Sequence, residues 1–479
     1  MITFIVVSNF VFSCYAEHDM LVYPIIVHER TSAGNMALVL HDRLTLNLER
    51  STVLADKLVM VTSSQHERQV KTVDTSAIQK NLYHDKHHRS SLMVHQRDGI
   101  VKVEGIINHK LRIKPVPQSE RSSRGHVLHR IYEVQETDDE LAKIVPNDQV
   151  PLPNTATMSP SHVHSAGPLL PRRLLEEFVV EVTVISDQLH QVHYQNDDDL
   201  ITYLAVMMNA VNLRYHGMHN PRIRFRLAGV TRSLVDVFAS YISGGYLEAY
   251  GTIEGLVNYV RNGNIPEQTD VVYLITHRDM INGKSGQAPA EQRMTGLSYV
   301  GGVCTKEKIG MGEDIAQSYR GVFTMAHELG HTLGAQHDQV GHRECPWSAG
   351  SLMSYVDGGE NRYRLTPCSK RQIRSVVSKL PEWCLMETSR RNYMVHPGTL
   401  PGNMISADVF CKLYLRRKTN SPQQYTKITR EYSRKCKMQC CYVTGRLTWC
   451  YEVDILDGMP CGEGKTCLKG ACRRQHPWF

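Results

Sequence analysis

The sequence predicts an α/β domain with a mixed, mostly parallel twisted sheet, preceded by a β-rich region and followed by a small disulfide-rich module. Three observations predict this organisation. Apolar runs typical of buried strands alternate with apolar residues at helical spacing between residues 178 and 380. Residues 15–303 contain no cysteine, whereas eight cysteines crowd residues 411–472. A length of 479 residues with 41% hydrophobic content is typical of about three globular domains.

Residues 1–16 are interpreted as a secretory signal peptide. They carry no charge, and Cys14-Tyr15-Ala16 offers a small-x-small cleavage site. A membrane anchor is the alternative, but the run is shorter than the roughly 20 apolar residues that a bilayer requires. No later segment approaches that length without a charge. We therefore expect an extracellular, secreted protein without a transmembrane anchor, and the twelve cysteines left after Cys14 fit six disulfides in an oxidising compartment.

Residues 17–173 are expected to form a β-rich propeptide. A polar, proline-bearing linker at residues 146–171 ends this region, and the pair Arg172-Arg173 is the predicted maturation site. Cleavage within residues 121–124 is the alternative, although it would split the run of predicted strands. Those strands are expected at residues 36–40, 58–61 and 100–103.

Residues 174–386 are expected to form the central α/β domain. Leu204, Met207 and Met208 lie on one predicted helix at core spacing, which favours packing over a ligand role for the methionines. The predicted strands of this domain are residues 178–186, 223–227 and 270–276, and its predicted helices include residues 200–216 and 370–380.

Residues 327–338 read His-Glu-Leu-Gly-His-Thr-Leu-Gly-Ala-Gln-His-Asp. Residues four apart share one face of a helix, so His327 and His331 can bind one zinc ion while Glu328 projects beside them. Gly334 can adopt the positive φ that ends a helix and returns His337 as a third ligand. Zinc lowers the pKa of a water in the open fourth position to about 7, and Glu328 is placed to accept its proton. This spacing predicts a zinc enzyme that hydrolyses peptide bonds.

The alternative is a surface helix that carries histidines by chance. With 24 histidines in 479 residues, a bare H-E-x-x-H arises in roughly a few per cent of such chains. Requiring Gly334 and His337 at their offsets lowers that chance to about one in ten thousand, which favours the zinc site.

Together with Met353 in Ser-Leu-Met-Ser-Tyr at residues 351–355, this string resembles the metzincin metalloproteases, whose methionine turn lies beneath the zinc. Asp338, directly after the third histidine, makes the chain similar to the reprolysin (adamalysin) branch, which includes snake-venom metalloproteases and the ADAM and ADAMTS proteins. The resemblance implies that residues 174–386 form a metzincin catalytic domain, which contains a long zinc-site helix. It also implies that the protein is made as a zymogen.

The same resemblance implies three further features of this domain. Gly296, Leu297, Ser298, Tyr299 and Val300 resemble the family's edge strand, which pairs antiparallel with the substrate backbone. Disulfides are implied between Cys304 and Cys384 and between Cys345 and Cys368, whereas the sequence alone allows three connectivities. A calcium site is implied at Glu181, Asp270 and Glu387, although the family usually has asparagine at the last position, and a charged surface without an ion is the alternative.

Latency of the zymogen requires an explanation. Many family prodomains use a free cysteine on the zinc, and this propeptide has none. The cluster His84-Asp85-Lys86-His87-His88 is one hypothesis for a metal-binding segment, and a solvated loop is its alternative.

Residues 400–479 resemble the cysteine-rich module that follows ADAMTS-type catalytic domains, and the secreted context favours disulfides over a second metal site. Residues 411–437 carry nine lysines and arginines against the single acid Glu431. A glycosaminoglycan or an acidic surface is the predicted partner of this stretch, and a merely solvated face is the alternative. Nucleic-acid binding is not expected, because the chain shows no recognition fold.

The predicted function is therefore that of a secreted zinc metalloendopeptidase acting on extracellular proteins. The order of its parts resembles the salivary metalloproteases of ticks, which implies fibrin, fibrinogen or matrix proteins of a host as substrates. The alternative is an adhesion or binding protein that acts through the cysteine-rich module on a protease scaffold. The intact ligands, base and methionine turn argue against that alternative.

Overall fold

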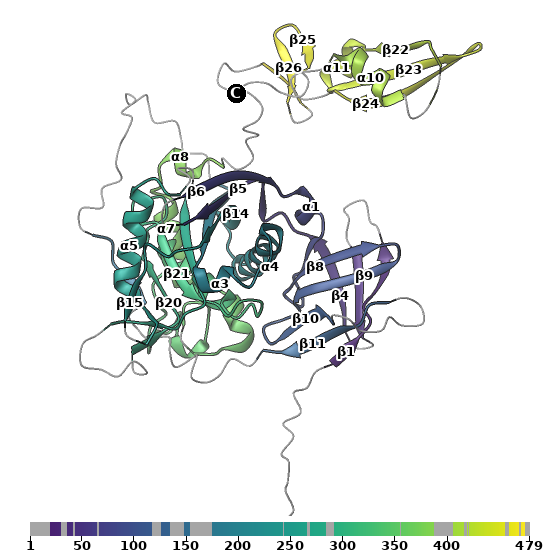
Figure 1. Cartoon of the computed structure of the whole chain (residues 1–479). Helices are drawn as coiled ribbons and strands as arrows, with labels where there is room; N and C mark the ends of the chain where they lie inside the picture. The colour runs from purple at the N-terminus through teal and green to yellow at the C-terminus, as the bar shows by residue number, and fades with distance from the viewer. Residues whose placement is uncertain are drawn as a thin grey trace, which may run out of the picture. The chain divides into compact units, whose positions relative to one another are not determined.

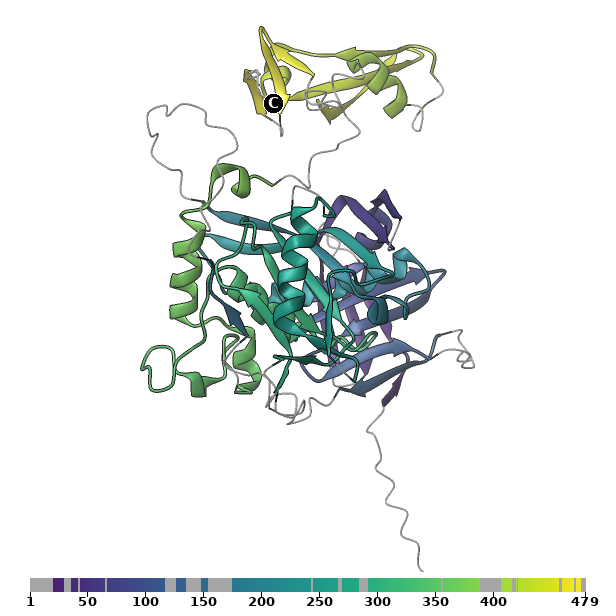
Figure 2. The same cartoon turned by 60° about the vertical axis from the view of Figure 1, so that its left-hand side comes forward.

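The computed structural model separates into two compact units, Met1–Arg390 and Arg391–Phe479 (Figures 1 and 2). The structure describes residues 20–29, 36–41, 44–64, 67–116, 126–134, 148–153, 175–242, 244–265, 269–283, 292–354, 356–387, 406–415, 419, 421–455, 459–468 and 471–474. The predicted signal peptide at residues 1–16 and both predicted cleavage sites, at residues 121–124 and 172–173, lie outside these residues.

An eight-stranded mixed sheet forms the centre of the first unit, in the order β12-β20-β21-β17-β13-β14-β5-β6. Five of its pairings are parallel, and only β20 with β21 and β5 with β6 are antiparallel. The predicted mixed, mostly parallel sheet is therefore confirmed. Its strands are β5 (Leu54–Ser63), β6 (Arg68–Asp74), β12 (Gln149–Val150), β13 (Glu177–Ser186), β14 (Arg222–Ser233), β17 (Val271–Thr276), β20 (Gly296–Tyr299) and β21 (Ile309–Glu313).

Helices cover both faces of this sheet (Figure 1). Successive residues of a strand point to opposite faces, and every residue of the central strand β17 is buried, as a sheet covered on both sides requires. Val271 and Tyr273 pack in one core with α4 (Asp197–Tyr215) and α6 (Val322–Thr332). Val272 and Leu274 pack in a second core with α5 (Ala249–Arg261). Among the described residues of the unit, the other helices are α1 (Ser76–Gln79), α3 (Gln188–Gln191), α7 (Pro367–Val377) and α8 (Glu382–Leu385), with 3-10 turns η2 (Trp347–Ala349) and η3 (Gly359–Tyr363).

Helix α4 begins where the sequence provides its start signals. The Asn196 side chain accepts a hydrogen bond from the Asp199 backbone amide, and three aspartates occupy the first turn, where the helix dipole favours negative charge. Leu204, Met207 and Met208 are buried in the core, as predicted.

The predicted propeptide is rich in β-structure. Its nine-stranded sheet has the order β1-β11-β10-β9-β8-β7-β4-β3-β2 and its own apolar core. Strands β5 and β6 of the same region instead extend the central sheet through β14, so the predicted propeptide and the central domain share one hydrophobic core. The sheet contains β1 (Met20–Val22), β2 (Ile25–Glu29), β3 (Met36–His41), β4 (Leu44–Arg50), β7 (Leu82–Asp85), β8 (Ser90–Arg97), β9 (Ile100–Ile106), β10 (Leu111–Pro115) and β11 (His129–Glu133).

A small four-stranded sheet, β15-β16-β18-β19, completes the first unit. Its strands are β15 (Ser240–Ile242), β16 (Tyr246–Glu248), β18 (Met280–Ile281) and β19 (Arg293–Met294). Among the described residues of the whole chain, no helix is long and apolar enough to cross a membrane.

The second unit is a disulfide-rich module whose core is built largely from cysteines. Four disulfides join Cys411 to Cys440, Cys436 to Cys467, Cys441 to Cys450, and Cys461 to Cys472. Its elements are α10 (Ala407–Leu415), β22 (Gln424–Lys427), α11 (Arg430–Arg434), β23 (Lys437–Thr444), β24 (Leu447–Asp454), β25 (Pro460–Gly462), β26 (Lys465–Leu468) and β27 (Ala471–Arg474).

Candidate metal centre and active site

Helix α6 presents His327 and His331 on one buried face. The Nδ1 atom of His327 lies 2.7 Å from the Leu352 carbonyl oxygen, and that of His331 lies 2.7 Å from the Ala335 carbonyl oxygen. A carbonyl oxygen only accepts, so each Nδ1 carries the proton and each Nε2 keeps its lone pair for a metal. Burial and the nearby His327 ring hold the pKa of His331 well below its ordinary value, which keeps that ring neutral.

The turn after α6 brings His337 to the same point. Gly334 has a φ of +98°, the left-handed conformation that ends the helix and reverses the chain. The three Nε2 atoms form a triangle, with separations of 3.2 Å for His327 to His337, 3.1 Å for His331 to His327 and 3.0 Å for His331 to His337. Two nitrogens bound tetrahedrally to zinc at about 2.0–2.1 Å would be about 3.3–3.4 Å apart, so the triangle fits this ion with a small expansion.

Glu328 lies beside the triangle, between α6 and strand β20. Its side chain is almost completely buried, and the Ser298 hydroxyl donates to its Oε2 at 2.6 Å and to its backbone carbonyl at 3.1 Å. Burial and the charge of Asp148 raise the pKa of Glu328 well above its ordinary value. Ser298 was predicted only as part of a substrate-binding strand, and the structure shows that its side chain also orients Glu328.

Met353 and Asp338 pack against the segments that carry the three histidines. Met353 is fully buried, and its sulfur packs so closely under Gly330 that a Cβ there would lie 2.6 Å from it. The Asp338 amide donates to the Met353 carbonyl at 2.9 Å, and the Thr366 hydroxyl donates to Asp338 Oδ1 at 2.7 Å. Asp338 therefore joins the loop of the third histidine to the methionine turn and to the start of α7.

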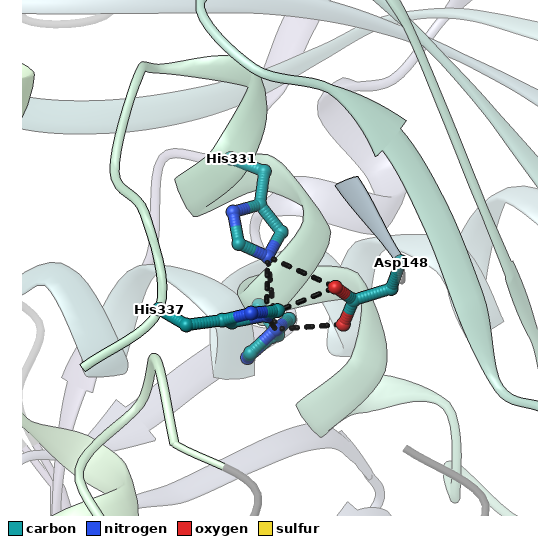
Figure 3. Close-up of side chains that lie close together, drawn as sticks. Asp148, His331 and His337 are labelled. Atoms are coloured by element: carbon teal, nitrogen blue, oxygen red, sulfur yellow. Dashed lines mark hydrogen bonds and ion pairs between the residues drawn. The ribbon is translucent and has the colours of Figure 1, made fainter. Parts of the chain in front are cut away.

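A residue that the sequence analysis did not single out, Asp148, points into the histidine triangle (Figure 3). Its Oδ2 lies 3.2 Å from His327 Nε2, while its Oδ1 lies 2.9 Å from His337 Nε2 and 3.7 Å from His331 Nε2. Asp148 belongs to the predicted linker and directly precedes β12, which pairs with β20. No local pattern marks it, because its neighbours in space come from a distant part of the chain.

The predicted edge strand lies at the rim of the central sheet. Gly296, Leu297 and Ser298 pair antiparallel with β21 on one side, and Ser298 and Tyr299 pair parallel with β12 on the other. Val300 follows the strand and donates its amide to the Val150 carbonyl at 3.0 Å. A segment of the chain therefore occupies the edge on which a substrate was predicted to pair.

The structure brings together two of the three predicted calcium ligands. The Glu181 amide donates to Asp270 Oδ2 at 2.8 Å, and both carboxyl groups are buried. Burial raises the pKa of Asp270 to about 8, and the charge of Glu181 adds to this shift. The third residue, Glu387, forms an ion pair with Arg226, which lies opposite Glu181 in the pairing of β13 with β14.

The four cysteines of the catalytic region lie in two pairs. The sulfurs of Cys304 and Cys384 are 2.07 Å apart, and those of Cys345 and Cys368 are 1.98 Å apart. The first disulfide ties the loop after β20 to α8.

The histidine cluster of the predicted propeptide does not join the metal centre. His84 lies 3.8 Å from Glu49, and His88 lies 3.0 Å from Asp85. Within the described part of the chain, the group around the three active-site histidines gains Asp148 instead.

Comparison with known proteins agrees with this geometry. Residues 178–376 match the reprolysin-type model of Metallo-peptidase family M12. The chain is 24% identical over 459 residues to the "A disintegrin and metalloproteinase with thrombospondin motifs like" protein of Bombyx mori, an alignment that covers 83% of this chain and 64% of that protein. It is 26% identical over 342 residues to an antarease-like venom metalloproteinase of Tityus trivittatus, covering 66% and 82% of the two chains.

Two further matches differ in coverage. "A disintegrin and metalloproteinase with thrombospondin motifs 10" of Homo sapiens is 28% identical over 335 residues, and the chain spans only 28% of it. Metalloproteinase-II of Bacteroides fragilis matches with a TM-score of 0.34 and 11% identity, covering 74% of this chain and 90% of that chain. Residues 178–376 are therefore similar to a reprolysin-type domain of Metallo-peptidase family M12, and the relatives named above are metalloproteinases by their names.

Proposed function

We propose that this chain is a zinc metalloendopeptidase that is made as a zymogen and cleaves extracellular proteins. The observation that carries the proposal is the triangle of His327, His331 and His337 nitrogens with the Glu328 carboxyl beside it. Three neutral imidazoles are a donor set typical of catalytic zinc, because they leave a fourth position open. Bound there, zinc would lower the pKa of a water and polarise the scissile carbonyl.

Glu328 supplies the acid-base chemistry. Its carboxylate accepts the proton of the attacking water and then delivers that proton to the leaving amine. The hydrogen bond from Ser298 holds one carboxyl oxygen, so the other is oriented for the proton transfer. The burial of the site strengthens these electrostatic interactions and excludes competing water.

Strand β20 supplies the substrate-binding surface in this proposal. Its free edge, once β12 has left it, offers backbone donors and acceptors from Gly296 to Val300 to an extended polypeptide. Main-chain hydrogen bonds recognise any extended segment, so side-chain preference must come from pockets beside the strand.

The proposal predicts that Glu328→Ala abolishes peptide cleavage. Loss of the general base should lower kcat/KM by at least about 10²–10⁴-fold while the protein remains folded and zinc-bound. The measurement is cleavage of a peptide library by the processed chain, with and without a chelator, followed by zinc restoration. Glu176→Ala, which changes an exposed glutamate of the same domain, is the matched control and should retain activity. Chelator-insensitive cleavage, or full activity in Glu328→Ala, would contradict the proposal.

Secretion and the substrate class belong to the same proposal. Six disulfides support an oxidising compartment, and the similar proteins include a venom metalloproteinase. Fibrin, fibrinogen and matrix proteins of a host are the proposed substrates, in line with the resemblance to tick salivary enzymes. Incubation of each protein with the processed chain, with identification of the new termini, tests this substrate class directly.

We also propose calcium as a structural ion at Glu181 and Asp270. Both side chains are buried, and the charge of Glu181 acts on the Asp270 carboxyl, an arrangement that is costly unless a positive charge lies nearby. Arg226 already pairs with Glu387, so the ion would rely on the first two residues and on oxygen ligands other than Glu387.

A further inference from the structure

Asp148 is placed as a ligand rather than as a surface charge. Its carboxylate is buried, and its oxygens lie 2.9 to 3.2 Å from His337 Nε2 and His327 Nε2. One oxygen of Asp148 and one nitrogen of each of the three histidines lie within 4.8 Å of one another. Figure 3 shows the Asp148 carboxylate facing the rings of His331 and His337. Carboxylate oxygen is an ordinary zinc ligand, and four ligands complete a tetrahedral site.

The backbone around Asp148 fixes this position. The Ser298 amide donates to the Asp148 carbonyl at 3.0 Å, and the Val300 amide donates to the Val150 carbonyl at 3.0 Å. Val150 and Leu152 pack against the core beneath α5. The segment of residues 148–153 is therefore held on the edge of β20 by both hydrogen bonds and apolar contacts.

The direction of this segment differs from that expected for a substrate. Strand β12 runs parallel to β20, whereas the resemblance to reprolysins implies antiparallel pairing for a substrate. A parallel peptide presents its carbonyls and amides in reversed order along the cleft. The segment can therefore fill the edge without offering a peptide bond in the productive orientation.

The charges of the site also favour a bound cation in this arrangement. The Asp148 carboxylate is buried beside three imidazole nitrogens, and a buried anion without a counter-charge costs several kcal/mol. A divalent ion held by these four groups supplies that counter-charge. The carboxylate of Asp148 takes the place that a catalytic site leaves for water.

We propose that Asp148 is the fourth zinc ligand of the unprocessed chain and that residues 148–153 keep the enzyme latent by occupying the substrate edge. This inference rests on the proposed zinc site and adds its regulation. The predicted propeptide has no cysteine that could bind the zinc, and the proposal assigns this inhibitory role to the Asp148 carboxylate instead. Activation then requires that Asp148 leave the metal and that β12 leave β20, which opens the metal position and the strand edge together.

The experiment uses the intact chain in four forms, namely the wild type, Asp148→Asn, Asp148→Glu and Asp98→Asn. Asp98 is an exposed aspartate of the predicted propeptide that lies 3.7 Å from the equally exposed Arg97, so Asp98→Asn is the matched control. The zinc dissociation constant is measured by chelator competition, and the ligand field is followed by the visible absorption of the cobalt-substituted protein. We expect Asp148→Asn to raise the dissociation constant about tenfold or more and to change the cobalt spectrum. Asp148→Glu should restore part of both signals, and Asp98→Asn should change neither.

A measurement on the wild type alone guards against a misfolded variant. A small hydroxamate should shift the cobalt spectrum of the processed chain but not that of the intact chain. An equal shift in both would overturn the proposal. An unchanged dissociation constant and spectrum in folded Asp148→Asn would also overturn direct ligation. Latency would then be explained only by residues 148–153 blocking the substrate edge. A processed wild-type chain that neither binds zinc nor cleaves peptides would instead contradict the proposed function itself.

Discussion

At the scale of single residues, two glycines show how one backbone conformation serves different purposes. Gly334 and Gly341 both have positive φ angles, of +98° and +76°. A Cβ on Gly334 would lie 2.3 Å from Val376 Cγ2, whereas nothing lies within 4 Å of a Cβ on Gly341. Gly334 therefore supplies both the turn that returns His337 and the space that α7 needs beside it.

Gly334→Ala should destabilise the chain more than Gly341→Ala. Both substitutions place a Cβ at positive φ, which costs of order 1 kcal/mol, but only the first adds an overpacking cost of about 1–3 kcal/mol. Because His337 follows the same turn, Gly334→Ala should also weaken zinc binding. Denaturant unfolding and chelator competition on both variants measure these effects. Equal losses in the two variants would show that the contact with Val376 has no energetic weight.

Most residues of the metal centre were predictable, because His327, His331 and Gly334 obey local rules of helix geometry and helix termination. The string also identified Glu328 as the base. Its partner Ser298 and the residue Asp148 were different, because each meets α6 only through the folding of the sheet. The spacing of residues along a helix carries no information about which distant strand will lie beside it.

At the scale of elements, the strand at residues 58–61 was predicted, but its partner was not. It belongs to β5, which pairs with β14 of the catalytic region, and Leu58 and Met60 are fully buried in the shared core. Hydrophobic alternation determines which face of a strand is buried, whereas the choice of partner depends on contacts between segments distant in sequence. The predicted boundary between the propeptide and the catalytic region rested partly on cysteine content, which carries no information about strand pairing. It therefore did not reveal that the central sheet continues across this boundary.

A second connection between these regions runs through Asn209 on α4. The Ser51 hydroxyl donates to its Oδ1 at 2.7 Å, and its Nδ2 donates to the Tyr83 carbonyl and to the Ser91 hydroxyl, each at 3.0 Å. A buried amide with satisfied donors and acceptor specifies one arrangement of the surrounding strands. The predicted propeptide is thus part of the folded framework around α4.

The proposed calcium site also depends on how elements meet, since Glu181 lies in β13 and Asp270 directly precedes β17. Added calcium should raise the melting temperature of the wild-type chain, because an ion that binds only the folded state at 100 times its Kd stabilises it by about 2.7 kcal/mol. Asp270→Asn should lose this response, and Asp98→Asn should keep it. The measurement is a thermal melt across a calcium titration at constant zinc. A wild-type melting temperature that does not change with calcium would contradict the site.

At the scale of the whole molecule, cysteines and basic residues are concentrated in the second unit. Cysteine spacing predicted a disulfide-rich module in the second unit, but it could not predict the pairing, because many connectivities share the same spacing. Within the described part of residues 411–437, Lys412, Lys427, Arg430, Arg434 and Lys435 are exposed. Lys435 pairs with Glu431 at 2.9 Å, and this exposed pair contributes little because water screens it.

We propose that this basic stretch binds a sulfated glycosaminoglycan and thereby concentrates the enzyme on matrix. The combined variant Lys427→Ala, Arg430→Ala and Arg434→Ala should elute from heparin at clearly lower salt than the wild type, since each lost cation removes a salt-screened attraction. A second variant, Lys465→Ala, Arg473→Ala and Arg474→Ala, removes the same charge from another exposed part of the same module. It should elute close to the wild type. If both variants elute at the same reduced salt concentration, the attraction reflects net charge rather than a site, and the solvated-face alternative is correct.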